Sequence, residues 1–158
     1  MYKLIALDID GTLLNSDKKI SDENKAAIAA ARAKGVRVVL VSGRPTGGMR
    51  DSLQALDMMS DDDYVLSYNA SVVQRVKSET IIRSQILTGQ DAKKLAKLAK
   101  QLDIDIHAFS HQKGLITPAH NDYTNHESEI NAEPITLIDF EELADDEAIL
   151  KVMLVDHA

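Results

Sequence analysis

The sequence predicts an α/β fold: a Rossmann-like parallel sheet core, followed by a smaller α+β region. Two observations carry this prediction. An apolar run at residues 4–7, a capped alanine-rich segment and a β-branched run at 36–41 together make a β-α-β unit. Beyond Leu87 the pattern changes to one amphipathic helix and several alternating strands. We therefore expect a first domain at residues 1–87 and a second at residues 88–158.

Composition limits the classes of partner. The chain has 158 residues, 44% of them hydrophobic, with a net charge of -7 and no cysteine. The hydrophobic share is enough for a packed core, and the negative charge argues against nucleic acid or an anionic membrane as a partner. No apolar run approaches the ~20 residues of a membrane span. The start lacks the pattern of a signal peptide, so we expect a cytoplasmic protein.

The apolar run at residues 4–7 predicts a buried first strand, which leads directly into two acids. Asp8 and Asp10 are two positions apart, so on an extended chain their side chains point to the same side. Two close carboxylates repel each other, and a hard cation such as Mg²⁺, which prefers oxygen ligands, removes that cost. Gly11 permits a tight turn and Thr12 supplies a hydroxyl. The pattern predicts a magnesium site; the plainer alternative is an ordinary Asp-Gly turn.

A helix and a second strand follow. Ser21 stands at the N-cap position, alanines give the helix a narrow face that can pack close to a sheet, and Gly35 ends it. Residues 36–41 are nearly all β-branched or apolar, which favours a strand covered on both faces. The two strands should be parallel, with their carboxyl ends at the same edge of the sheet.

The turn after the second strand is predicted to lie beside the acids. Ligands of open α/β sheets bind beyond the carboxyl ends of the strands. We expect the Ser42 hydroxyl and the Gly43 amide, together with Thr12, to bind phosphate oxygens. Arg44 either binds substrate phosphate or pairs with a carboxylate. The plainer alternative is a strand-to-helix turn without a ligand.

A helix at residues 46–58 and a third strand at 64–68 complete the predicted parallel part. Asn69 follows the third strand, where it either lines the site or serves as a turn residue. Ala70 comes next, so a turn that needs a positive φ would be strained. Residues 72–76 and 80–86 then indicate a hairpin.

The second domain begins with a capping-box spacing at Thr88 and Asp91, followed by an apolar helical stripe. Residues 104–109 alternate and predict a half-exposed antiparallel strand, with residues 114–117 as its partner. We expect a short strand at 135–138, a brief helix at 140–143 and a strand at 150–155. The histidines all lie in this part, and we expect them to be exposed to solvent.

Two segments resemble the haloacid dehalogenase (HAD) superfamily. Residues 8–14, Asp-Ile-Asp-Gly-Thr-Leu-Leu, resemble its first motif, and residues 41–44, Val-Ser-Gly-Arg, resemble its second. Asn69 resembles the start of an Asn-Gly-Ala motif of the Cof-like sugar phosphatase branch. The resemblance implies a Mg²⁺-dependent phosphatase acting on a small phosphorylated metabolite, such as a sugar or nucleotide phosphate. It implies Asp8 as the nucleophile that forms an aspartyl-phosphate, and Asp10 as general acid and base, with its backbone carbonyl on the metal.

The resemblance also implies parts that this sequence lacks. Such phosphatases use a lysine beside the nucleophile and an acidic metal loop that usually begins Gly-Asp, and this sequence has no Gly-Asp pair. Lys151 falls in the region that resembles the mixed α/β cap, so it is not assigned the catalytic role. We therefore expect an incomplete core with a partial cap, weak or no activity of residues 1–158 alone, and an unpaired sheet edge open to association.

Two other classes of function stay open. One is a phosphoryl-transfer mutase of the same superfamily. The other is a non-catalytic binding fragment or a phospho-accepting receiver domain. A receiver carries its phospho-accepting aspartate after the third strand, where this chain has Ser67, Tyr68 and Asn69, and this argues against it.

Overall fold

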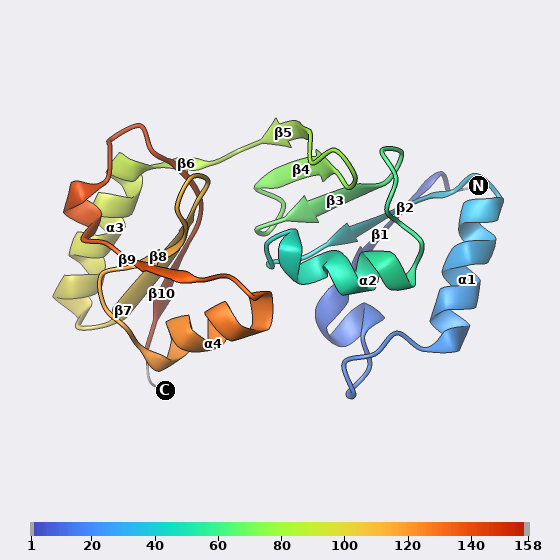
Figure 1. Ribbon diagram of the computed structural model, residues 1–158, viewed down its shortest axis with the longest axis horizontal. Coiled ribbons are helices and arrows are strands. Elements are labelled where there is room, and N and C mark those ends of the chain that lie inside the picture. The colour runs from blue at the N-terminus through green and yellow to red at the C-terminus, as the bar shows by residue number, and fades with distance from the viewer. Residues whose placement is uncertain (1, 157–158) are drawn as a thin grey trace. The chain divides into compact units, whose positions relative to one another are not determined.

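The computed structural model describes residues 2–156, which fall into two compact units divided between Ser84 and Gln85. Each unit has its own five-stranded sheet (Figure 1). The sequence placed the boundary nearby, after Leu87. Because parallel strands with crossover helices occur in the first unit, the predicted α/β class is confirmed.

The first unit is a β-α-β-α-β core extended by a hairpin. Its first three strands are parallel and its last two are antiparallel additions. The sheet order is β1 (Leu4–Asp8), β2 (Arg37–Val41), β3 (Tyr64–Ser67), β4 (Val72–Arg75) and β5 (Ile81–Ser84). The connecting helices are α1 (Asp22–Ala33), the short turn η2 (Gly47–Met49) and α2 (Arg50–Ala55). The carboxyl ends of β1, β2 and β3 therefore lie at one edge of the sheet, as predicted.

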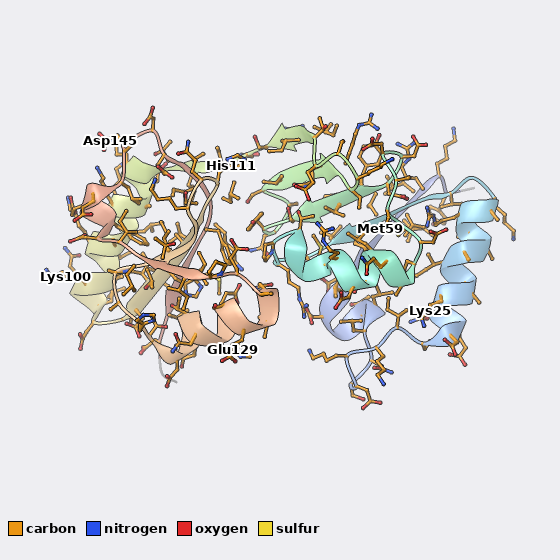
Figure 2. The ribbon with its side chains drawn as sticks, viewed as in Figure 1. Lys25, Met59, Lys100, His111, Glu129 and Asp145 are labelled. Atoms are coloured by element: carbon orange, nitrogen blue, oxygen red, sulfur yellow. The ribbon has the colours of Figure 1, made fainter. Side chains whose placement is uncertain are left out.

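The helices of this unit are placed by local signals and by one apolar core. The Ser21 hydroxyl accepts the backbone N–H of Asn24 at 3.2 Å, which caps α1. Leu40 and Val65 of the strands and Leu53 of α2 are buried in the same cluster. Met59, labelled in Figure 2, follows α2 and packs against this cluster. The core thus holds the helices against one face of the sheet.

The strand β1 lies at the edge of its sheet, and this corrects one expectation. The sequence predicted a buried first strand, but among residues 2–156 β1 pairs only with β2, and Leu4 is 53% exposed. The helix α1 has no buried residue either. A strand with a neighbour on one side only leaves its other edge and alternate side chains uncovered. The expected unpaired edge is therefore present, and association through it stays a prediction.

The second unit is a mixed sheet whose order differs from the chain order. Strands β8 and β9 are parallel, and the other pairs are antiparallel. The order is β6 (Leu87–Thr88), β10 (Ala148–Val155), β7 (Asp105–Ser110), β8 (Gly114–Thr117) and β9 (Ile135–Leu137). The helices are α3 (Gly89–Leu102), α4 (Asp122–Asn131) and the short turn η3 (Phe140–Glu142). The long β10 lies between β6 and β7.

The helix α3 begins as predicted and covers one face of this sheet. Thr88 and Asp91 form the expected capping box. Gly89 is required there, because a Cβ at this position would lie 2.0 Å from the carbonyl oxygen of Ala144. The buried face of α3 packs against alternate residues of β7, whereas Lys100 points away from the sheet (Figure 2). The sequence therefore specified both the start and the buried face of α3.

The helix α4 covers the face of the sheet opposite to α3. Two expectations are corrected here, the half exposure of β7 and the exposure of all histidines. The segment around Tyr123 is mostly polar, so no apolar periodicity predicted this helix. Its N-cap is Asn121, whose side-chain oxygen accepts the N–H of Thr124. The strand β7 was expected to be half exposed, yet residues 106–110 are all buried. His107 is 0% exposed, so the expectation of exposed histidines is wrong for this residue. Helices on both faces explain this burial.

None of the helices in residues 2–156 has the length and apolar character that crossing a membrane requires.

Candidate active site

The end of β1 presents both predicted acids to solvent. Asp8 is the last residue of the strand, and a π-type turn spans Ile9–Leu13. Asp10 keeps an extended backbone at φ -79 and ψ 120, and Gly11 has φ 75, a conformation that favours glycine. Asp8 and Asp10 are exposed on either side of the fully buried Ile9. Both acids are therefore accessible to solvent at the end of β1, while Ile9 between them belongs to the apolar core.

The end of β2 brings Ser42 to the same edge. Asp8 pairs with Val41 in the sheet register, so the next residue, Ser42, lies beyond the neighbouring strand end. Ser42 is 5% exposed, and its hydroxyl oxygen accepts the backbone N–H of Arg44 at 3.2 Å. A hydroxyl that accepts one hydrogen bond still has its own proton to donate. Gly43 lies in the turn between these two residues.

The end of β3 is hydrogen-bonded to that turn. The N–H of Tyr68 donates to the Arg44 carbonyl and the N–H of Asn69 to the Ser42 carbonyl, both at 3.0 Å. Tyr68, Asn69 and Ala70 have φ values of 51, 58 and 65. Three consecutive residues in the left-handed region are costly without glycine, so the strain expected at Ala70 is present. Asn69 is exposed and stands next to Ser42.

The strongest interaction of the site joins Arg44 to Asp10. The guanidinium donates from Nη2 to Oδ1 at 2.7 Å and from Nε to Oδ2 at 2.9 Å, a two-pronged contact with the Asp10 carboxylate. Its third nitrogen, Nη1, donates to the carbonyl oxygen of Gly48 at 3.3 Å. Of the two roles that the sequence left open for Arg44, the structure shows pairing with a carboxylate.

A second cation, Lys18, was not singled out from the sequence. Its Nζ lies 3.4 Å from Oδ1 of Asp10, with the lysine side chain 70% exposed. The loop that carries it is closed by Asn15, whose side-chain oxygen accepts the N–H groups of Asp17 and Lys19 at 3.0 and 2.9 Å. Asn15 signals such a turn in the sequence, but only the fold shows that Lys18 reaches Asp10.

These cations set the electrostatics of Asp10. Partial burial raises the pKa of this carboxyl group, but the hydrogen bond and charge of Arg44, with those of Lys18, outweigh it and hold the pKa below its ordinary value of 3.8. In this state Asp10 is therefore a carboxylate at neutral pH.

The acids fit a partial magnesium site. Proteins commonly hold Mg²⁺ by one or two carboxylates, with waters and substrate phosphate completing the shell. Residues 2–156 contain no cluster of three or more His, Asp or Glu side chains that would hold a metal ion by itself. The exposed Asp8 carboxylate and the backbone carbonyl of Asp10 suit such an ion. Both side-chain oxygens of Asp10 accept hydrogen bonds from Arg44, and the contribution to the metal that we expect from Asp10 is its backbone carbonyl.

Thr12 lies beside a groove next to the first strand. It lines a groove of about 270 Å³ between β1 and α1, together with Ile5 and Leu7 of the strand. Of the predicted site residues, Asp10 is therefore hydrogen-bonded to Arg44 and Ser42 to Asn69. Thr12 lines the groove.

Comparison with known proteins identifies the family. Residues 5–158 match the family of haloacid dehalogenase-like hydrolases. The chain belongs to this family. The Bacillus subtilis protein named "Putative phosphatase YxeH" is 36% identical over 158 residues, which is 99% of this chain and 58% of that protein. The 5-amino-6-(5-phospho-D-ribitylamino)uracil phosphatase YcsE of B. subtilis is 44% identical over 71 residues, 45% of this chain and 27% of that protein.

Solved structures of the family have the same fold. A haloacid dehalogenase-like hydrolase from Bacteroides thetaiotaomicron superposes with a TM-score of 0.78 and 30% identity, over 99% of this chain and 59% of that one. The HAD subclass IIB sugar phosphatase BT4131 gives a TM-score of 0.69 at 20% identity, over 92% of this chain and 56% of that one. The expected membership of the haloacid dehalogenase superfamily is thus confirmed. The chain spans 58% of the length of YxeH.

Proposed function

We propose that this chain carries the catalytic acids of a Mg²⁺-dependent HAD phosphatase that hydrolyses small phosphate monoesters. The observation that carries the proposal is the pair of exposed acids at the carboxyl end of β1, one of which is held by Arg44. A single exposed acid at a strand end would be an ordinary turn residue. Two acids at alternate positions, one fixed by a guanidinium and one left available, suit two different chemical roles.

In the first step Asp8 is the nucleophile. A carboxylate oxygen of Asp8 forms a bond to phosphorus, and the bond from phosphorus to the ester oxygen breaks. Asp10, a carboxylate in the structure, first takes up a proton from solvent; this proton then passes to the departing oxygen, and Asp10 is a carboxylate again. The Ser42 hydroxyl, at the neighbouring strand end, donates a hydrogen bond to a phosphoryl oxygen, and we include the Gly43 amide and Thr12 as further ligands. We also include Asn69, which is hydrogen-bonded to Ser42, as a residue that contacts substrate.

In the second step water releases the phosphate. A water oxygen forms a bond to phosphorus, the bond from phosphorus to Asp8 breaks, and a water proton returns to Asp10. Both steps bring negative oxygens toward the negative Asp8. Bound Mg²⁺ would offset these charges.

Lys18 is the lysine that contacts the acids within the described residues, and it does so at Asp10. The lysine beside the nucleophile and the acidic metal loop that the resemblance implies have no counterpart identified in residues 2–156. We therefore expect residues 1–158 alone to hydrolyse phosphate esters weakly or not at all.

The names of relatives support the class of substrate. YcsE is named as the phosphatase of a phosphorylated ribityl compound, and BT4131 is described as a sugar phosphatase. A sugar or nucleotide phosphate is accordingly our first choice, and the reaction would take place in the cytoplasm.

The test is to trap the phosphorylated residue. The polypeptide encoded by the complete reading frame would be incubated with Mg²⁺ and a phosphate ester, quenched in acid, and digested for mass spectrometry. We expect phosphate on the peptide that contains Asp8, and none in the Asp8→Asn variant. Phosphate on another residue, or steady hydrolysis by the variant, would show that Asp8 is not the nucleophile.

A further inference from the structure

The Arg44 side chain is fixed at both ends. At its backbone, the N–H donates to the Ser42 hydroxyl and the carbonyl accepts the N–H of Tyr68. At its tip, two nitrogens donate to the Asp10 carboxylate and the third donates to the Gly48 carbonyl. A guanidinium held in this way has one orientation, and it imposes that orientation on the carboxylate that it grips.

The same geometry leaves Asp10 able to exchange a proton. A carboxylate has about four lone-pair directions; Arg44 takes one on each oxygen and Lys18 also contacts Oδ1, which leaves a free direction on Oδ2. The side chain of Asp10 is 42% exposed, whereas that of Arg44 is 22% exposed. The carboxylate is thus the outer partner of the pair, and Arg44 holds it from the protein side.

We propose that Arg44 is a positioning residue that orients Asp10 for proton transfer, and that it is not a ligand of the substrate phosphate. This inference rests on the proposed phosphatase function. In the first step Asp10 gives its proton to the departing ester oxygen and is left as a carboxylate, which is the species that Arg44 holds in the structure. In the second step a water proton returns to Asp10. Arg44 keeps its own protons throughout.

Lys18 provides an internal comparison. It touches Asp10 through a single atom pair at 3.4 Å and is 70% exposed, so it adds charge without fixing the plane of the carboxylate. Removing Lys18 should therefore have a much smaller effect than removing Arg44.

The test uses the dependence on the leaving group. An alkyl phosphate needs a proton on its departing oxygen, whereas p-nitrophenyl phosphate leaves without one, so only the alkyl ester depends on a well-placed acid. In the polypeptide of the complete reading frame, Arg44→Gln should lower kcat/KM for the alkyl ester about 100-fold and for the aryl ester less than about fivefold. This ratio reports the steps through phosphoryl transfer to Asp8, so later hydrolysis does not obscure it.

Arg44→Lys separates positioning from phosphate binding. Lysine keeps the positive charge that would attract phosphate but loses the fork that grips both oxygens. We expect it to show the same unequal loss as Arg44→Gln. Rescue of both esters by lysine, or an equal loss of both with a raised KM, would overturn the proposal. If Arg44→Gln fails to fold, Arg44→Lys still provides the test.

Arg32→Gln is the matched structural control. Arg32 also joins a carboxylate, Asp63, at 2.8 Å and two backbone carbonyls, but its contacts lie outside the candidate site. Its removal should lower thermal stability without changing the ratio between the two esters. A change in that ratio equal to the one for Arg44 would show that the effect is general loosening, and would overturn the inference.

Different results would overturn the proposed phosphatase function and the inference about Arg44. If the unmodified polypeptide hydrolyses neither ester, or if Asp8→Asn keeps activity, the phosphatase proposal and this inference fall together. If hydrolysis requires Asp8 but the loss in Arg44 variants is uniform, this inference alone is wrong. In an Asp10→Asn background, Arg44→Gln should cause no further selective loss, because the group that it positions is gone.

Discussion

The acids of the candidate site in the first unit are exposed, whereas several titratable side chains of the second unit are buried. In the first unit Asp8 and Asp10 stand exposed at the end of an edge strand, β1, and the helix α1 beside it has no buried residue. In the second unit His107 is 0% exposed, and the ion pair of Lys151 with Glu127 has side chains only 14% and 13% exposed. The sheet there is covered on both faces around β7.

The difference shows what burial does to a titratable group. A buried group is held in one protonation state and contributes to stability, whereas a group at a strand end can exchange protons and meet a ligand. We therefore place the chemistry in the first unit and assign the polar interior of the second to packing. Four predictions test this division, from the largest expected effect to the smallest.

The largest effect should come from Asp8. Asp8→Asn should lower kcat for phosphate ester hydrolysis by about a thousandfold or more in the polypeptide of the complete reading frame, because the amide is a poor nucleophile. The second-unit variant Lys151→Met should keep kcat within about threefold at temperatures where it is folded, since its charge serves packing. A loss in Lys151→Met as deep as that in Asp8→Asn would place chemistry in both units.

Stability should respond most strongly to the interior of β7. Phe109 is 1% exposed, and Phe109→Ala should lower the free energy of unfolding of the second unit by about 3–5 kcal/mol through lost burial and a cavity. Leu4, in the edge strand, is 53% exposed, and Leu4→Ala should change the free energy of unfolding of the first unit by less than about 0.5 kcal/mol. Hydrogen exchange of the β7 and β2 amides measures the two values. A large cost for Leu4→Ala would mean that β1 is covered in solution.

Acidification should weaken the second unit first. Burial lowers the pKa of His107 below its ordinary value of 6.5; the nearby Glu127 opposes this and Lys151 adds to it. Between the folded and unfolded pKa values the unfolded chain binds the extra proton, so this contribution to stability is present above about pH 6.5 and is lost as the pH falls below it. His107→Asn should remove this pH dependence between about pH 7.5 and about pH 5.5.

Glu147 provides a control for the pH dependence of stability assigned to His107. Hydrogen bonds from Lys113 and Ser110 hold its pKa below the ordinary value of 4.5, so the stability it contributes is present above that value and is lost as the pH falls further. Glu147→Gln should therefore leave the slope near pH 6 unchanged. If the slope persists in His107→Asn, another group is responsible and His107 is not the sensor of the second unit.

The smallest effect should come from the strained turn after β3. Ala70 has φ 65, and Ala70→Gly removes the steric cost of that conformation. Because glycine also increases the entropy of the unfolded chain, we expect a net gain of at most about 1 kcal/mol for the first unit. Thermal unfolding measures it. Ala70→Val should be destabilising, because β-branched residues tolerate this region poorly.

Local patterns predicted most of the fold. The capping residues Ser21 and Thr88, the apolar periodicity of α3 and the β-branched run of β2 each act within a few residues, so periodicity and capping rules detect them. The polar helix α4 escaped these rules because its sequence has no apolar stripe. The burial of β7 escaped them for the same reason, since it depends on a helix that the pattern does not reveal.

By itself, the sequence determined the spacing of Asp8 and Asp10 and the glycine turn that follows them, because a strand alternates its side chains and only glycine readily takes the conformation of Gly11. Only the tertiary structure decided which cation meets Asp10. Arg44 lies 34 positions away along the chain, and no local rule encodes that contact. The β-α-β crossover brings the ends of β1 and β2 together, and this proximity turns two separate turns into one candidate site.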